Sequence, residues 1–125
     1  MDEDKVYEFL DLYRNPEQFG KPKDFDVEEE GFSESCGDNF TVYLKFDGDS
    51  IRDVHFEGSG CIISTVSISK LCSALRGRRR SSVPKMGIDD VKKLLGVKTI
   101  SMSRARCATV GLDAIKLAVE KTGDE

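Results

Sequence analysis

The first regular pattern along the chain is an apolar stripe at helical spacing near the N-terminus. Apolar residues recur three and four positions apart, at Val6, Phe9, Leu10 and Tyr13. This spacing predicts a short helix that begins near Asp4 and docks on the body of the protein. A proline follows Asn15 and disfavours the α conformation there, so the helix should end and a loop should cover about residues 14–23.

Alternating apolar and polar positions then predict strands. Residues 25–35 have a weak and polar pattern, whereas a clear alternation follows at Phe40, Val42, Leu44 and Phe46. The Asp-Gly-Asp-Ser sequence at 47–50 is typical of a turn, and residues 51–56 resume strand character. We therefore expect an antiparallel sheet of about three strands.

The second half of the chain has helical patterns. Apolar residues between Ile62 and Leu75 spread around most of the helix circumference, which predicts burial on more than one side. The arginine-rich segment 76–82 should be an exposed connection to a short helix over about 88–95 that stops at Gly96. An amphipathic helix is predicted from Ala108 onward. This order indicates an α+β fold, with a three-stranded antiparallel sheet packed against several helices.

The composition favours a single domain in water. The 125 residues are 38% hydrophobic and 34% charged, so we expect residues 1–125 to form one domain with a modest core. No apolar run approaches the ~20 residues of a transmembrane helix, and the acidic N-terminus is unlike a signal peptide. These features predict a cytoplasmic protein with no membrane partner. In that compartment the four cysteines are expected to be free, catalytic or metal-bound rather than disulfide-bonded.

Three of the cysteines lie in local sequences that suit a metal site. Cys61 and Cys107 each precede or open a predicted helix, where free N–H groups favour a thiolate. Cys36 lies between strands, and Asp38 can supply an oxygen ligand. Three sulfurs and one oxygen suit Zn²⁺ or a [2Fe–2S] cluster, and such an incomplete thiolate set should release a cluster readily. The spacing alone matches no standard zinc pattern, and cysteines are also common in cores.

Other reactive residue types have simpler interpretations. Cys72 lies in an apolar helical segment and is read as a core residue. His55 alternates with core positions, so we expect it to face solvent and not to bind metal. The arginines at 76–80 do not indicate nucleic acid, because the chain is acidic and interleaved aromatics are absent; an acidic protein partner is a conceivable use. Arg104 and Arg106 flank Cys107, where they can stabilise negative charge or simply belong to an exposed segment.

Four segments carry a resemblance to a known family. They are Tyr-Arg-Asn-Pro at 13–16, Ser-Cys-Gly-Asp at 35–38, Phe-Glu-Gly-Ser-Gly-Cys-Ile-Ile-Ser at 56–64, and Arg-Ala-Arg-Cys-Ala at 104–108 followed by Leu-Asp-Ala-Ile at 112–115. In this order, from Tyr13 to about Lys121, the chain resembles the NifU/IscU/SufU family of iron–sulfur cluster assembly scaffolds. The resemblance implies an IscU/SufE-like fold, with ligands at Cys36, Asp38, Cys61 and Cys107.

The function that this resemblance implies is cluster assembly. A cysteine desulfurase would supply sulfur, an iron donor would supply iron, and the finished [2Fe–2S] cluster would pass to apo-proteins from a monomer or homodimer. An alternative is a zinc-dependent sulfurtransferase of the SufU type, in which Zn²⁺ fixes the site and Cys107 carries a persulfide. A third is a purely structural zinc module. Because the chain has 1 histidine, His55, and it is poorly placed, we expect a carrier and not a self-sufficient enzyme.

The resemblance has two departures. IscU-type members carry a histidine immediately before the third cysteine and a Leu-Pro-Pro-x-Lys chaperone-binding stretch ahead of it. This chain has Arg106 and Ile-Ser-Met-Ser-Arg at 100–104 in those places, so a dedicated Hsp70-type chaperone is not implied. A basic residue before the third cysteine resembles the SufU type, but the SufU insertion between the second and third cysteines is missing. Both subtypes therefore stay open.

Overall fold

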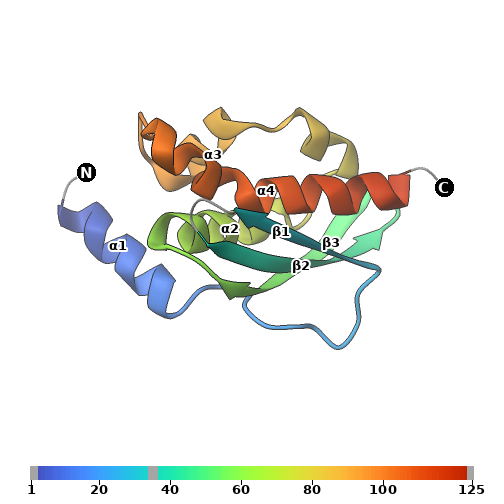
Figure 1. Cartoon of the computed structure of the whole chain (residues 1–125). Coiled ribbons are helices and arrows are strands. Elements are labelled where there is room, and N and C mark those ends of the chain that lie inside the picture. Colours follow the sequence, from blue (N-terminus) through green and yellow to red (C-terminus); the bar gives the residue numbers. More distant parts are fainter. Residues whose placement is uncertain (1–2, 34–36, 124–125) are drawn as a thin grey trace.

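A computed structural model describes residues 3–33 and 37–123 of the chain (Figure 1). Within these residues, helices pack against a three-stranded antiparallel sheet, which confirms the predicted fold class. The elements in chain order are α1 (Glu3–Arg14), β1 (Val27–Ser33), β2 (Asp38–Asp47), β3 (Ser50–Ser59), α2 (Ile62–Leu75), the 3₁₀ helix η1 (Arg80–Lys85), α3 (Ile88–Leu95) and α4 (Met102–Gly123).

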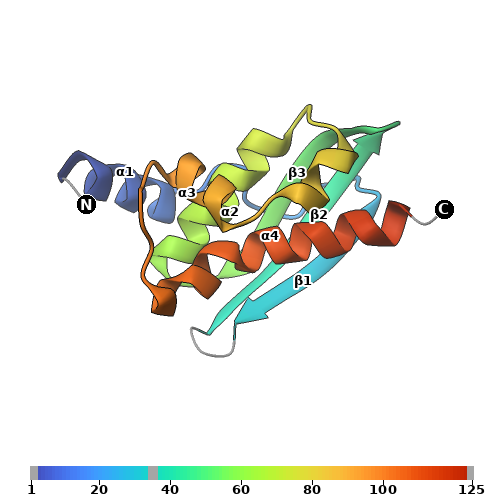
Figure 2. The ribbon, with the colours of Figure 1, turned by 90° about the horizontal axis from the view of Figure 1, so that it is seen from above.

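The core lies between the sheet and helices α2 and α4. The strands follow the order β1-β2-β3, and Val42 pairs with Phe56 while Leu44 pairs with Val54. These four side chains are fully buried, because strand alternation turns them all toward the same face. Helices α2 and α4 lie across that face (Figure 2). The apolar circumference predicted for 62–75 is confirmed, because buried residues occur on all sides of α2.

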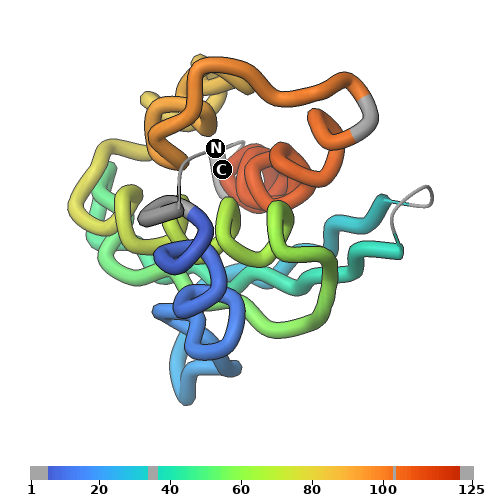
Figure 3. The backbone as a smooth tube through the Cα atoms, turned by 90° about the vertical axis from the view of Figure 1, so that its left-hand side faces the viewer, coloured from blue at the N-terminus to red at the C-terminus, as the bar shows by residue number. Residues whose placement is uncertain are grey.

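Helix α4 approaches β1 closely enough to require glycine in the strand. A Cβ added to Gly31 would lie 2.8 Å from the Val110 carbonyl oxygen and 2.9 Å from Ala114 Cβ. Such distances are inside ordinary van der Waals contact, so a larger residue would push the helix away. Seen along α4, helices α2 and α4 lie on one side of the sheet, and α1 packs against α2 (Figure 3).

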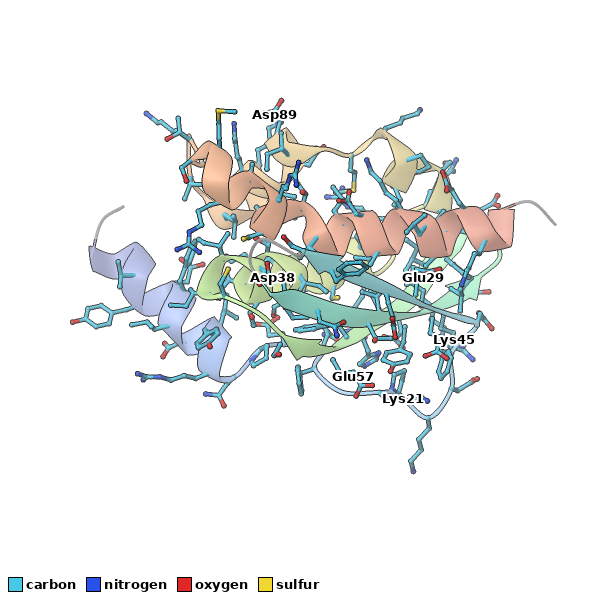
Figure 4. The ribbon with its side chains drawn as sticks, in the orientation of Figure 1. Lys21, Glu29, Asp38, Lys45, Glu57 and Asp89 are labelled. Atoms are coloured by element: carbon cyan, nitrogen blue, oxygen red, sulfur yellow. The ribbon has the colours of Figure 1, made fainter. Side chains whose placement is uncertain are left out.

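The segment between α1 and β1 covers the free edge and the outer face of the sheet. Phe56 N–H donates to the Gln18 carbonyl at 3.0 Å, and Gly20 N–H donates to the Phe56 carbonyl at 2.7 Å, so the outer edge of β3 is paired at Phe56. The ring of Phe25 then packs edge-on against Tyr43 at 5.1 Å. Figure 4 shows Lys21 and Glu57 on this outer side, opposite α2 and α4.

Helix α4 begins earlier than predicted. The sequence pattern placed its start at Ala108, whereas the helix runs from Met102. The N–H groups of Arg104 and Ala105 donate to the Ser101 carbonyl at 2.9 and 3.0 Å, and no glycine or proline interrupts the first turns. Cys107 therefore lies inside the helix, more than one turn beyond its start. The expectation that it opens a helix was wrong, and the helix-dipole argument applies only to Cys61.

The arginine-rich connection is more ordered than the sequence suggested. It contains η1, which was not predicted, and its backbone pairs with the β2–β3 hairpin, where Ile51 N–H donates to the Arg78 carbonyl at 2.8 Å. Arg76 forms an ion pair with Asp53 at 3.0 Å, and the Arg80 guanidinium lies 4.0 Å from the centre of the Phe46 ring. Part of this positive charge thus stabilises the hairpin. Docking of an acidic partner here stays a prediction.

Candidate metal centre

Asp38, the first residue of β2, presents a buried carboxylate between the sheet and α2 (Figure 4). Its side chain is 1% exposed. The oxygen Oδ1 accepts two hydrogen bonds, from the backbone N–H of Cys61 and from the Ser64 hydroxyl, each at 2.9 Å. The oxygen Oδ2 is buried and has no hydrogen-bond partner among the described residues. A buried carboxylate oxygen without a donor is costly, and a bound cation would remove that cost.

Cys61 caps the N-terminus of α2, as the sequence predicted. Its backbone is extended, and its sulfur accepts the N–H of Ser64 at 3.5 Å. The preceding Gly60 has no room for a side chain, because a Cβ there would lie 2.4 Å from Ser64 Oγ and 2.5 Å from Asp38 Oδ1. The loop can therefore bring Cys61 beside Asp38 only with glycine at position 60. Cys61 remains partly exposed.

Cys107 reaches the same place from α4. Its side chain is fully buried, at 0% exposure, and it is disulfide-bonded in this structure. The expectation that the cysteines are not disulfide-bonded was therefore wrong for Cys107, because the fold brings its sulfur next to a second one. The sulfurs of Cys61 and Cys107 and a carboxylate oxygen of Asp38 all lie within 4.8 Å of one another. Sulfur and oxygen ligands around a tetrahedral zinc ion lie about 3.6–3.8 Å apart, given Zn–S bonds of about 2.3 Å and Zn–O bonds of about 2.1 Å. A small contraction would thus close these three groups around one ion.

The structure brings together three of the four ligands that the sequence analysis named. The fourth, Cys36, lies outside the described residues. Once the disulfide of Cys107 is reduced, two thiolates with one carboxylate are a suitable donor set for zinc or iron. The buried Asp38 oxygen that has no donor among the described residues supplies independent support. The residues present therefore fit a metal ion or an iron–sulfur cluster. These ligand roles are developed below as a proposal.

Cys72 differs from the site cysteines. It is fully buried within the core cluster, and burial raises the pKa of its thiol far above the usual range. It lies about three turns along α2 from Cys61, which places it away from the Asp38–Cys61–Cys107 cluster. The prediction that Cys72 is a core residue is confirmed.

His55 lies on the outer face of the sheet, opposite Tyr43 in the strand register. The prediction that it points away from the core is confirmed. It is only partly exposed, however, and its Nδ1 atom is buried without a hydrogen-bond partner among the described residues. The sequence pattern could not show this, because the shielding depends on the rest of the fold. His55 does not belong to the Asp38–Cys61–Cys107 cluster.

Arg104 and Arg106, which precede Cys107 in the sequence, contribute to different surfaces. Arg104 lines an apolar groove of about 580 Å³ together with Cys61 and residues of α1, whereas Arg106 lines a groove between α4 and β1 that includes Glu30 and Asp113. Arg104, and not Arg106, therefore borders the groove through which Cys61 is accessible from solvent. Sequence reasoning named both arginines but could not separate them, because that requires knowing where α4 begins.

Ser64 is a site residue that sequence reasoning missed. It is fully buried, and it contacts Asp38 through its hydroxyl and Cys61 through its backbone N–H. Its position in the Gly-Cys-Ile-Ile-Ser segment was the available signal. A serine three residues after an N-cap position can bond to groups at the start of the helix.

A family model described as the NifU-like N terminal domain matches residues 3–123. The chain belongs to this family. Membership covers α1 through α4, including Asp38, Cys61 and Cys107. Among the described residues, no helix combines the length and the apolar character that crossing a membrane requires.

Two curated relatives carry different functional names. The zinc-dependent sulfurtransferase SufU of Bacillus subtilis is 30% identical, over 90% of this chain and 86% of the relative. The iron–sulfur cluster assembly scaffold protein IscU of Thermotoga maritima is 39% identical, over 66% of this chain and 58% of the relative. The family resemblance inferred from the motifs is confirmed, and the two subtypes are not separated by these similarities.

Solved structures share the fold. A crystal structure from Fervidobacterium islandicum, described as a proposed cluster assembly scaffold for the SUF system, has a TM-score of 0.76 at 28% identity and covers 94% of this chain and 99% of that one. The N-terminal part of a NifU-like protein from Brucella abortus has a TM-score of 0.78 at 18% identity, over 98% of this chain and 97% of that one. The second likeness concerns the fold alone.

Proposed function

We propose that this protein is a scaffold on which [2Fe–2S] clusters are assembled and from which they are transferred to apo-proteins. Membership in the NifU-like family supports this function. The single observation that carries it is the buried oxygen of Asp38 that has no hydrogen-bond partner among the described residues and lies beside Cys61 and Cys107. Iron and sulfide are cargo, held by Asp38, Cys61, Cys107 and the predicted ligand Cys36. The partners are a cysteine desulfurase, an iron donor and acceptor apo-proteins, and residues 1–125 act as one domain, a monomer or a homodimer.

Sulfur enters the site by persulfide exchange. The acceptor thiolate attacks the outer sulfur of a persulfide on the desulfurase, a new S–S bond forms, and the donor cysteine leaves as a thiolate when its own S–S bond breaks. The sequence hypothesis gave this role to Cys107. Its complete burial favours Cys61 of these two, because Cys61 is partly exposed and lines the groove beside α1.

The choice of acceptor is tested by incubating the protein with a cysteine desulfurase and L-cysteine, then locating the persulfide by peptide mass spectrometry. We expect more persulfide on Cys61 than on Cys107 at early times. The buried Cys72 is the internal control and should stay unmodified. Earlier labelling of Cys107 would reject Cys61 as the first acceptor and restore the sequence hypothesis.

The second candidate function is a zinc-dependent sulfurtransferase. The specific observation in its favour is the similarity to the Bacillus subtilis SufU over 90% of this chain. In this case Zn²⁺ stays in the site and fixes the ligands, and a persulfide is passed on without cluster formation. The protein would then have a catalytic activity of its own, whereas the scaffold function makes it a carrier.

Anaerobic reconstitution separates the candidates. The purified protein is analysed for metal and acid-labile sulfide, then supplied with iron and sulfide, and its visible absorption is compared with that of Cys61→Ser and Cys107→Ser. We expect a cluster spectrum that both substitutions abolish and that the control Cys72→Ala retains. Tightly held zinc with no cluster and a stimulated desulfurase would support the sulfurtransferase. Zinc with no effect on a desulfurase would leave only a structural module.

A further inference from the structure

The hydrogen bonds around Asp38 divide its two oxygens into different roles. Both donors, the Cys61 N–H and the Ser64 hydroxyl, bond to Oδ1 at 2.9 Å. Ser64 has one hydroxyl proton, and its other acceptor, the Cys61 carbonyl, lies farther away at 3.1 Å. A bond to a carboxylate is also stronger than one to a neutral carbonyl. The Ser64 hydroxyl therefore donates its hydrogen bond to Asp38 Oδ1, which leaves Oδ2 as the oxygen available to a cation.

Ser64 contacts two of the three described candidate ligands, Asp38 and Cys61. Its hydroxyl holds Asp38, and its backbone N–H donates to Cys61 Sγ at 3.5 Å. The residue is fully buried, so water does not compete for these bonds. The lack of space at Gly60, where a Cβ would lie 2.4 Å from Ser64 Oγ, shows how closely the three groups fit.

We propose that Ser64 is a positioning residue for the metal, holding the Asp38 carboxylate through Oδ1 so that Oδ2 is directed to the cation. This inference rests on the proposed function, because it assumes that Asp38 is a ligand. The hydroxyl gives Oδ1 a second donor besides the Cys61 N–H, and two donors from different groups restrict the rotation of the carboxylate. Groups that orient metal ligands in this way contribute about 10- to 100-fold to metal affinity.

The chain offers a matched control on the same helix. Ser67 lies one turn farther along α2, is 2% exposed, and its hydroxyl has no hydrogen-bond partner among the described residues. Ser64→Ala and Ser67→Ala therefore remove the same group from equally buried positions of one helix. Only the first removes a bond to Asp38. The backbone N–H of residue 64 is retained in both variants.

The test measures Zn²⁺ affinity by competition with a chelating dye, and the absorption spectrum of the Co²⁺ form. We expect Ser64→Ala to lower Zn²⁺ affinity by about 10- to 100-fold and to shift the Co²⁺ bands, while Ser67→Ala matches the wild type in both. In an Asp38→Ala background, Ser64→Ala should have no further effect on affinity, because the group it positions is gone. Thermal unfolding of the metal-free variants is recorded in parallel.

Two results would overturn the proposal. One is an unchanged Zn²⁺ affinity in Ser64→Ala, even with a lower unfolding temperature, since the hydroxyl would then matter only for the fold. The other is an equal loss of affinity with and without Asp38. Failure of the proposed function looks different: if Cys61→Ser and Asp38→Ala bind Zn²⁺ as the wild type does, the site itself is wrongly assigned, whatever Ser64 does.

Discussion

At the scale of single residues, Asp38 has the surroundings that argue most directly for a cation. Its carboxylate is 1% exposed and one of its oxygens has no donor among the described residues. Natural structures rarely leave a buried charged oxygen unpaired, because the desolvation cost is not recovered. The metal-free protein therefore carries a local destabilisation that a bound ion relieves. This is the opposite of a structural aspartate, whose removal weakens the fold.

The substitution Asp38→Asn is expected to stabilise the metal-free protein and to weaken metal binding. The amide oxygen can still accept the bonds from Cys61 and Ser64, while the buried charge is lost. The gain in the free energy of unfolding should be about 1 kcal/mol or more. Urea denaturation with a chelator present measures the first effect, and Zn²⁺ titration measures the second. A lower stability together with unchanged affinity would mean that Asp38 has only a structural role.

At the scale of elements, the connection between α1 and β1 gives the outer face of the sheet some properties of a core. Tyr43 is 3% exposed beneath this connection, and its hydroxyl donates to the carboxylate of Glu57. Burial, followed by the bond to Glu57 and its charge, raises the pKa of Tyr43 well above that of a free tyrosine. Tyr43 therefore links the covering segment, through its contact with Phe25, to strand β3, through its hydrogen bond to Glu57.

This coupling predicts a loss of stability at alkaline pH. In the unfolded chain a tyrosine ionises near pH ~10, whereas Tyr43 in the folded protein stays protonated to higher pH. The stabilisation linked to this raised pKa is fully present below about pH 10 and is lost as the pH rises toward the folded value. Wild type should thus lose stability above about pH 10 more steeply than Tyr43→Phe.

Urea midpoints measured across the alkaline range provide the test, with Tyr7→Phe as the control because Tyr7 is 60% exposed. The tyrosinate absorbance of the wild type should also contain a late component that Tyr43→Phe removes. Parallel pH profiles for wild type and Tyr43→Phe would show that the phenol is not the source of the alkaline instability.

At the scale of the whole molecule, the site joins parts of the fold that are separate in sequence. Asp38 belongs to β2, Cys61 caps α2, and Cys107 lies in α4. The unfolded chain does not hold these groups together, so a metal ion at the proposed site would bind mainly to the folded state. Metal binding should therefore stabilise the entire domain, and not only the loops around the site.

Zn²⁺ is accordingly expected to raise the unfolding temperature of the wild type. Free zinc at about 100 times its dissociation constant should contribute about 2.7 kcal/mol. Cys61→Ser should lose most of this shift, since a serine hydroxyl is a poor zinc ligand. Cys72→Ala is the matched control: a core cavity lowers its baseline unfolding temperature, but the zinc-induced increase should remain. An equal increase in Cys61→Ser and wild type would place the zinc elsewhere.

The sequence by itself determined the local elements and the identity of the reactive residues. Helical and alternating periodicities depend on neighbours a few positions apart, so they correctly indicated α1, the three strands, α2 and α3. The same local information placed Cys61 at the start of a helix and Cys72 in the core. It failed at the start of α4, because a helix without an apolar stripe in its first turns gives no periodic signal.

The tertiary structure alone decided which atoms meet and which oxygen of Asp38 is left for a cation. The bonds from Cys61 and Ser64 to Asp38 span 23 and 26 residues of chain, respectively. Periodicity carries no information over such separations, since they are set by how α2 packs against the sheet. For the same reason, only the folded protein shows that Cys107 is buried and that His55 is partly shielded. It also shows that Arg104 and Arg106 line different grooves.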